Sequence, residues 1–317
     1  MKCSKELLLF LSHLDFIKAN EKIALVEKGF TFETLSKLSL NDFAYVLGRP
    51  LTSSDFCAHT FARQLEKDFS VLQAYDIHII SFWDEDYPPL LKEIYDSPLC
   101  LFVRGDIGCL KRNTLGIVGT RYPSFDSMKQ TFSFAKESVE NGFCIVSGLA
   151  NGIDTYAHKG ALEGYFSLRE QKKEIFGATC GVLAGGVDGI YPSSNKKLAA
   201  NILKFGGCLV SEYPPFSESF KWRFPKRNRI ISGLSQGLVV MQAPPGSGAL
   251  ITVDFALEQN REVFFHENVL TDYQEKKSSS KRSARKYIED GANVIKTFQD
   301  ISINSCIKTI QQLLLDL

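Results

Sequence analysis

Two patterns of hydrophobic and polar residues divide the chain. From residue 5 to about residue 75, leucines and phenylalanines recur at steps of three and four, the spacing of one face of an amphipathic helix. From residue 115 onward, short apolar runs alternate with helix-like segments, as in LGIVG at 115–119, FCIVSG at 143–148 and GLVVMQ at 237–242. The pattern predicts a small helical module followed by a larger α/β unit.

The apolar runs of the second unit are short and continuous. Strands buried on both faces of a sheet have this pattern, and parallel strands need the crossover helices that separate the runs. We therefore expect an extended Rossmann-like, doubly wound, mostly parallel sheet. We interpret the β-like segments at 77–82 and 99–103 as the stretch of chain that leads into this sheet. The expected division is a helical module at 1–75, the Rossmann-like domain at 76–298 and a C-terminal helical tail at 299–317.

Composition narrows the function classes. The formal net charge is +1, from 37 basic and 36 acidic residues, so a polyanion would have to meet a local patch. Eight cysteines lie far apart without a CxxC pair, as in a reducing compartment, and no metal site is expected. His13 and Asp15 interrupt the apolar N-terminal run, and no stretch of about 18 apolar residues occurs. The sequence predicts a cytoplasmic protein without a membrane span.

Glycine-rich turns follow the predicted strands, and doubly wound sheets bind ligands at the carboxyl ends of their strands. In the turn GTR, Gly119 lets the backbone approach a ligand and Arg121 offers a guanidinium suited to phosphate. The alternative is a tight turn with a solvated arginine. A third turn leads to Lys196 and Lys197, which face either phosphate or solvent.

The second turn carries Ser147 and Gly148 and leads into a helix. Asp154 is interpreted as the N-cap of that helix, because a carboxylate there accepts hydrogen bonds from free amides. His158, one turn later, has no cysteine or carboxylate at ligand spacing, so it is expected to be a buried structural histidine.

Cations and aromatic rings alternate in the segment FKWRFPKRNR at 220–229. Proteins that bind single strands combine cations that follow the phosphates with rings on which bases stack. The alternative is that Trp222 and Phe224 anchor the core while some arginines pair with acids. The later turn Gly246-Ser247-Gly248 either binds an oxyanion through its amides or is only a tight connection.

Six segments, in order, resemble the signature segments of the DprA/Smf family: GIVGTRYPS, IVSGLANGIDTYAHKGAL, YPSSNKKL, LVSEYPP, FPKRNRIISGLS and PPGSGALITVDFALEQNREVFF. The resemblance implies an extended Rossmann domain that binds and protects single-stranded DNA and loads the RecA recombinase in natural transformation or recombination. It also implies a homodimer, no enzymatic activity, no cofactor and an N-terminal module similar to a sterile alpha motif.

The resemblance assigns roles to individual residues. Arg121 and Lys221 are expected to hold phosphate, and Phe224 to stack on a base. The expected nucleic-acid-binding set is Gly119, Thr120, Arg121, Ser147, Gly148, Lys196, Lys221, Phe224, Arg227, Asn228 and Arg229, with Gly246, Ser247 and Gly248 as a candidate oxyanion loop.

Two features depart from the family pattern, and the role of a third segment has two alternatives. Residues 165–176 are an expected addition to the compact pattern, and no winged-helix tail is expected. The basic, serine-rich segment at 276–286 either widens the DNA path or is solvated.

Three other function classes compete. A nicotinamide or flavin oxidoreductase would carry GxGxxG, whereas the first turn here is GIVGTR. A nucleotide phosphoribohydrolase of the lysine-decarboxylase-like fold uses a PGGxGTxxE loop, and Val253 stands where its catalytic glutamate would be. A purely structural role explains neither the basic, aromatic segment nor the glycine turns. The sequence favours DNA binding, with the phosphoribohydrolase as the alternative.

Overall fold

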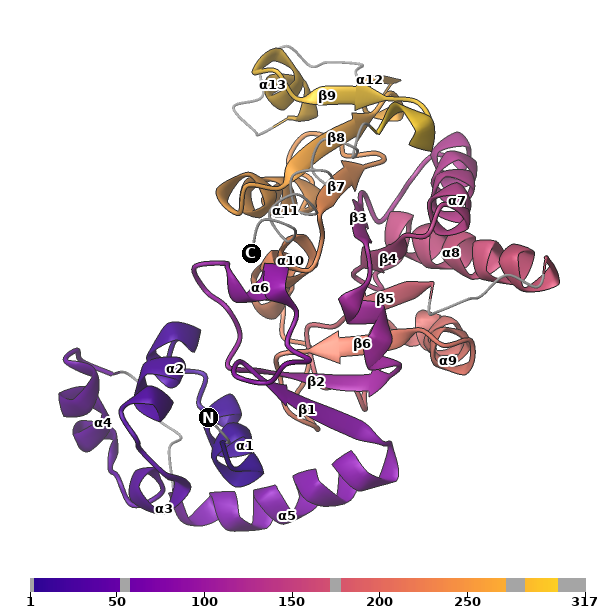
Figure 1. Ribbon diagram of the computed structural model, residues 1–317. Coiled ribbons are helices and arrows are strands. Elements are labelled where there is room, and N and C mark those ends of the chain that lie inside the picture. Colours follow the sequence, from indigo (N-terminus) through magenta and orange to yellow (C-terminus); the bar gives the residue numbers. More distant parts are fainter. Residues whose placement is uncertain (1–2, 52–57, 172–177, 272–282, 302–317) are drawn as a thin grey trace, which may run out of the picture.

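The structure is a computed structural model that describes residues 3–51, 58–171, 178–271 and 283–301. Its centre is a nine-stranded sheet in the order β1-β2-β6-β5-β4-β3-β7-β8-β9 (Figure 1). The seven strands from β6 to β9 in this order are parallel, and β2 and β1 continue the sheet as antiparallel strands. The strands are β1 (Ile77–Ser81), β2 (Cys100–Gly105), β3 (Thr114–Val118), β4 (Cys144–Ser147), β5 (Thr179–Val182), β6 (Cys208–Ser211), β7 (Gly237–Val240), β8 (Glu262–His266) and β9 (Asn293–Ile295).

Helices cover both faces of the parallel strands, which explains why those strands are apolar throughout. In β3, Ile117 packs in a core with Phe134 on one face, whereas Val118 packs in a core with Ile231 on the other. The helices that follow the N-terminal module are α6 (Pro89–Lys92), α7 (Phe125–Glu140), α8 (Ile153–Glu170), α9 (Lys196–Lys204), α10 (Arg223–Gly233), α11 (Ala249–Glu258), α12 (Asn268–Thr271) and α13 (Ala284–Glu289). The predicted doubly wound, mostly parallel sheet is confirmed.

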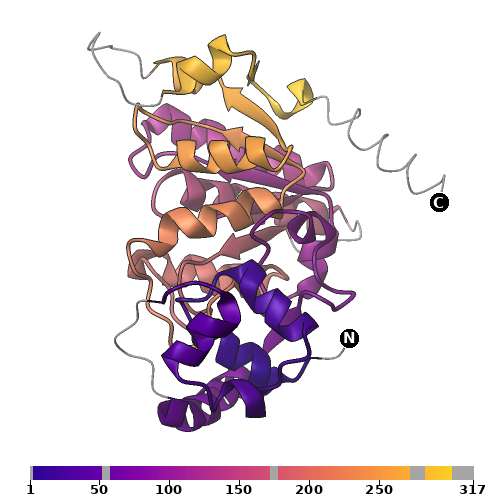
Figure 2. The same cartoon turned by 90° about the vertical axis from the view of Figure 1, so that its left-hand side faces the viewer.

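The N-terminal helices lie at the β1 end of the sheet (Figure 1), and in the turned view they form the indigo part at the bottom, opposite the yellow C-terminal elements (Figure 2). They are α1 (Lys5–His13), α2 (Ala19–Glu27), α3 (Phe32–Leu35), α4 (Leu40–Leu47) and α5 (Ala58–Ala74). One hydrophobic cluster joins Phe10 and Phe43 of these helices to Phe102 of β2 and Leu209 of β6. The helical module is therefore packed against the sheet through a continuous apolar core.

Several predicted boundaries differ from the structure. The segments at 77–82 and 99–103 are not an approach to the sheet, because they form its strands β1 and β2. Helix α8 extends to Glu170, so residues 165–170 of the expected addition continue this helix. Asp154 is the second residue of α8, so its expected N-cap role is wrong. Residues 172–177, most of the basic segment at 276–286 and the tail at 302–317 lie outside the described residues.

The length and hydropathy of the helices bear on membrane insertion. Within the described ranges, none of them combines the length and the apolar character that crossing a bilayer requires.

Candidate nucleic-acid interface

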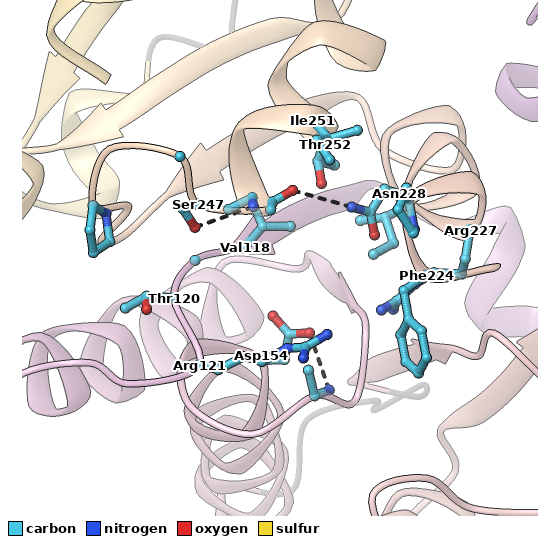
Figure 3. A pocket seen from close by; sticks show the side chains of 18 of the residues that line it. Val118, Thr120, Arg121, Asp154, Phe224, Arg227, Asn228, Ser247, Ile251 and Thr252 are labelled. Carbon is cyan, nitrogen blue, oxygen red and sulfur yellow. Dashed lines mark hydrogen bonds between the residues drawn. The ribbon is translucent and has the colours of Figure 1, made fainter. Parts of the chain in front are cut away.

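A cavity of about 630 Å³ opens at the carboxyl ends of the parallel strands (Figure 3). Its walls come from the turns after β3 and β7 and from residues of α8 and α10. The strand order reverses between β3 and β7, since the chain leaves β3 toward β4 and later returns to pair β7 on its other side. Ligands of doubly wound sheets bind at this reversal.

The turn after β3 is fixed on both sides. A Cβ atom on Gly119 would lie 2.5 Å from the Ile153 side chain, so only glycine fits there. The Thr120 amide donates to the Gln242 carbonyl at 2.8 Å, and the Ile153 amide donates to the Thr120 carbonyl at 3.1 Å. Arg121 therefore extends into solvent at the cavity from a backbone that the sheet holds in place.

Cations and rings meet across this cavity. The Arg121 guanidinium lies 5.6 Å from the centroid of the Phe224 ring, within the range of a cation–π interaction. The Tyr191 ring contacts Phe224 edge to face, with centroids 5.7 Å apart. Lys221 is exposed at the rim, two residues before the start of α10. The arrangement offers two exposed cations beside a partly accessible aromatic face.

The floor of the cavity contains a buried arginine and a buried acid. Arg227 is 5% exposed and its Nη1 donates to a β5 carbonyl at 2.8 Å. Burial lowers the pKa of Arg227 to about 10, although Asp154 opposes the shift. Burial also raises the pKa of Asp154, against the effects of Arg227, of the Ala150 amide and of Arg121. Gly148 has no room for a side chain, because a Cβ would collide with both charged groups.

The turn after β7 closes the cavity on the side of α11. The Asn228 Nδ2 donates to the Gly248 carbonyl at 3.4 Å, which links this turn to α10. The Ser247 hydroxyl accepts from the Ala249 amide at 3.3 Å (Figure 3). Gly246, Ser247 and Gly248 all line the cavity, and their binding of an oxyanion stays a prediction.

The structure brings most of the expected binding residues to this one cavity. Figure 3 shows Arg121 and Asp154 on one side of it and Phe224, Arg227 and Asn228 on the other. The expected residues that line it are Gly119, Thr120, Arg121, Lys221, Phe224, Arg227, Asn228, Gly246, Ser247 and Gly248.

Three further expected residues lie near the cavity or away from it. Gly148 lines a smaller neighbouring cavity together with Phe224. Ser147 is fully buried, its hydroxyl donates to the Ile117 carbonyl at 2.6 Å, and it is not among the lining residues, so its expected backbone contact with DNA stays a prediction. Lys196 is exposed at the start of α9 and is not among the lining residues.

Arg229, which was expected to shape or line the pocket, is not among the residues that line the cavity. Arg229 is 3% exposed, and its Nη2 lies 2.6 Å from a carboxylate oxygen of Glu212. Its Nε lies 3.0 Å from a carboxylate oxygen of Asp96. Arg223 is held in a similar way, since its Nη2 lies 2.6 Å from a carboxylate oxygen of Asp15. These two arginines follow the alternative in which part of the basic segment pairs with acids inside the fold.

Sequence reasoning gave no binding role to two residues of the cavity. Tyr191 follows the third predicted strand, and only the folded chain shows that its ring contacts Phe224. Asp154 was interpreted as a cap, whereas the structure places its carboxylate on the cavity floor. The available signal was the position of both residues just beyond a predicted strand. His158 is fully buried as expected, with its Nδ1 2.7 Å from the Thr179 hydroxyl.

The strand order and the cavity at its reversal define a Rossmann-like ligand-binding protein with cations and rings at its site. The profile of the DNA recombination-mediator protein A family matches residues 78–305. The chain belongs to this family, which confirms the resemblance stated from the sequence motifs.

Individual relatives agree with this placement. The DNA processing protein DprA of Bacillus subtilis (strain 168) is 44% identical over 198 residues, which cover 61% of this chain and 63% of that protein. The chain thus spans less than two thirds of that relative's length.

Solved structures extend the likeness to most of the chain. The structure of DprA from Streptococcus pneumoniae matches with a TM-score of 0.69 and 30% identity, covering 95% of this chain and 98% of that one. A structure of DprA from Helicobacter pylori, concerned with the single-stranded DNA binding mode of that protein, matches with a TM-score of 0.59 and 26% identity, covering 74% of this chain and 97% of that one.

Proposed function

We propose that this chain binds single-stranded DNA at the cavity and acts as a recombination mediator. The observation that carries the proposal is the convergence of Arg121, Lys221 and the Phe224 ring at the carboxyl ends of the strands. Phosphates would contact the two cations while a base stacks on the ring. Such stacking contributes roughly 1–3 kcal/mol per base in proteins that bind single strands.

The electrostatics of the cavity support an anionic ligand. Within the described part of the chain, neither Arg121 nor Lys221 has an acidic partner within ion-pair distance. Both side chains therefore keep their donors for a ligand, and an arginine fork matches the oxygens of a phosphate. At the floor, burial raises the pKa of Asp154, and the nearby Arg227 guanidinium opposes that shift.

Family membership supports the wider role. We infer that the protein protects single strands in the cytoplasm during transformation or recombination and helps to load RecA, without a cofactor and without catalysis. A homodimer would place two such cavities on one strand and raise the overall affinity through the effective concentration of the second site. The Helicobacter pylori relative, for which a single-stranded DNA binding mode is described, supports the choice of ligand.

The chain lacks the glutamate carboxylate that the phosphoribohydrolase alternative requires. Val253 is fully buried in α11, so the position of the expected glutamate carries an apolar side chain that faces the core. Among the described residues that line the cavity, Asp154 is the only acid, and its carboxylate accepts the Ala150 amide at 3.2 Å. The absence of a glutamate at position 253 favours binding without hydrolysis.

The test is fluorescence anisotropy with labelled oligo-dT, with unlabelled single strands and duplexes as competitors. We expect the single strand to compete better, and Arg121→Ala and Lys221→Ala to weaken binding. Lys28→Ala, which removes an exposed cation from the helical module, is the matched control and should bind like the parent. Equal competition by duplex, or parent-like affinity in both cavity variants, would overturn the proposal. Release of free base from nucleoside monophosphates would support the hydrolase instead.

A further inference from the structure

Two aromatic side chains next to the cavity are more exposed than a core role explains. Tyr122 is 90% exposed and Phe125 is 72% exposed. Both follow Arg121 closely in the chain, and Tyr122 lines the lip of the cavity while Phe125 begins α7 just outside it. Exposed rings scattered singly need no explanation, but these two are three positions apart in the chain, and the first lines the candidate DNA-binding cavity.

The backbone beneath the two rings is fixed. The Tyr122 amide donates to the Thr120 hydroxyl at 3.2 Å, and the Ser124 amide donates to Gln242 Oε1 at 2.9 Å. Ser124 also caps α7, because its hydroxyl accepts the Ser127 amide at 3.1 Å. The rings therefore project from an ordered turn, which lowers the entropy lost when a ligand stacks on them.

The charges around Phe125 favour a base over a phosphate as its contact. The Lys129 ammonium lies 4.6 Å from the centroid of the Phe125 ring. Asp126, also exposed, is the acid of the first turn of α7. Lys129 therefore lies over one face of the ring, and the large exposed fraction of Phe125 leaves ring surface on which a base can stack.

We propose that Tyr122 and Phe125 form a second stacking subsite, which takes the bases of nucleotides that leave the cavity past Arg121. The occupant is the same single strand, because Tyr122 belongs to both the cavity lip and this subsite. The proposal rests on the proposed function and deepens it. The bound strand is then longer than the cavity alone can hold, and affinity increases with oligonucleotide length on account of these rings.

The test compares two oligo-dT lengths, about 4 and about 12 nucleotides, within the range of site sizes of single-strand binders. We expect the parent to bind the longer strand more tightly, and Phe125→Ala to reduce this gain roughly fivefold, as loss of one exposed stacking contact predicts. The Phe125→Tyr variant keeps an aromatic ring and should show the same length-dependent gain in affinity as the parent. Tyr45→Ala removes a ring of α4 that is 89% exposed, against 72% for Phe125, and is the matched control.

The outcomes separate this inference from the proposed function. If Arg121→Ala weakens binding of the short strand but Phe125→Ala leaves the length-dependent gain intact, the second subsite is wrong and the cavity stands. If Arg121→Ala and Lys221→Ala both bind the short strand like the parent, or if the parent binds neither strand, the proposed function fails and the subsite fails with it.

A spectroscopic measurement reports stacking directly. The parent carries two tryptophans, Trp83 and Trp222, whose signal serves as the background. In Phe125→Trp, we expect the longer strand to quench fluorescence beyond the quenching seen in the parent, and the shorter strand to add little. Equal quenching in the variant and the parent with the longer strand would contradict stacking at this position.

Discussion

Basic residues at the start of α10 face two environments, the cavity and the protein interior, and their roles differ between the two. Toward the cavity, Lys221 is exposed and Phe224 contacts Tyr191. Toward the interior, Arg223 and Arg229 are 6% and 3% exposed and each lies 2.6 Å from a carboxylate oxygen. A cation that faces solvent beside a cavity can exchange water for phosphate. A cation that is already paired in the interior contributes to folding instead.

The difference shows that the role of a cation depends on acids far away in the sequence. Arg223 pairs with Asp15, which lies 208 positions earlier in the chain. Arg229 of α10 pairs with Glu212, which is 17 positions earlier and directly follows β6. A segment of alternating cations and rings therefore indicates binding as a whole, while the division of labour within it is set by tertiary contacts.

The largest expected effect is on stability, at the interior side. Arg229→Ala should remove the nearest partner of buried Glu212 and leave it with Lys226, whose Nζ lies 3.9 Å away, which costs unfolding free energy toward the lower end of about 3–5 kcal/mol. Urea denaturation measures the loss. The double variant Arg229→Ala with Glu212→Gln should recover part of it, because the buried charge is gone. A loss of less than about 0.5 kcal/mol would show that the pair is not buried as described.

The next effect is on binding, at the cavity side. Arg121→Ala and Lys221→Ala should each lower the affinity for oligo-dT roughly tenfold, since hydrogen bonds to charged groups contribute about 1.5–3 kcal/mol. Both residues are exposed, so the unfolding free energy should stay within about 0.5 kcal/mol of the parent. Anisotropy and urea denaturation of the same preparations separate the two quantities. If the two variants lost stability but kept their affinity, these cations would contribute to folding rather than to binding, contrary to the comparison.

A smaller effect is expected at the ring between the two sides. Phe224→Ala should weaken binding toward the lower end of about 1–3 kcal/mol, because Arg121 and Tyr191 already cover part of the ring. Phe224→Tyr keeps the stacking face and should bind like the parent. Isothermal titration with a short oligo-dT compares the three proteins, and equal weakening by both substitutions would argue against stacking.

The smallest effect concerns the acid on the cavity floor. Burial raises the folded-state pKa of Asp154, so its contribution to stability is fully present below its unfolded pKa, about 3.9, and is lost as pH rises through the folded pKa. The Asp154→Asn variant does not lose this stability, because asparagine does not ionise. The stability of the variant relative to the parent should therefore increase, by on the order of 1 kcal/mol, as pH is raised from about 4 to about 7. Urea denaturation across that range tests the sign, and a difference that does not change with pH would contradict it.

Much of the fold follows from local patterns. The apolar runs and helical spacings predicted the parallel strands and the helices that separate them, such as α7 at Phe125–Glu140 between β3 and β4. The strand-end rule placed Gly119 and Arg121 at the site, because topology brings the carboxyl ends of parallel strands to one edge. These features depend on interactions close in sequence or on rules that hold for every sheet of this type.

The rest depends on contacts between distant residues. Nothing in the local sequence shows that Asp96 and Glu212 hold Arg229 in the interior, or that β2 pairs antiparallel with β6. The edge-to-face contact of Tyr191 with Phe224 and the burial of Asp154 likewise arise only when separate loops meet. Such pairings are decided by the geometry of the assembled sheet, which residue spacing does not encode.

The most direct test of the central account is the salt dependence of oligo-dT affinity for the parent and for Lys221→Ala. If exposed cations at the cavity contact phosphates, the logarithm of the affinity falls linearly with the logarithm of the salt concentration, by about 0.7 per phosphate contact on a single strand. We predict a slope shallower by about that amount in Lys221→Ala. A parent affinity that does not change with salt, or a variant with the slope of the parent, would contradict the account.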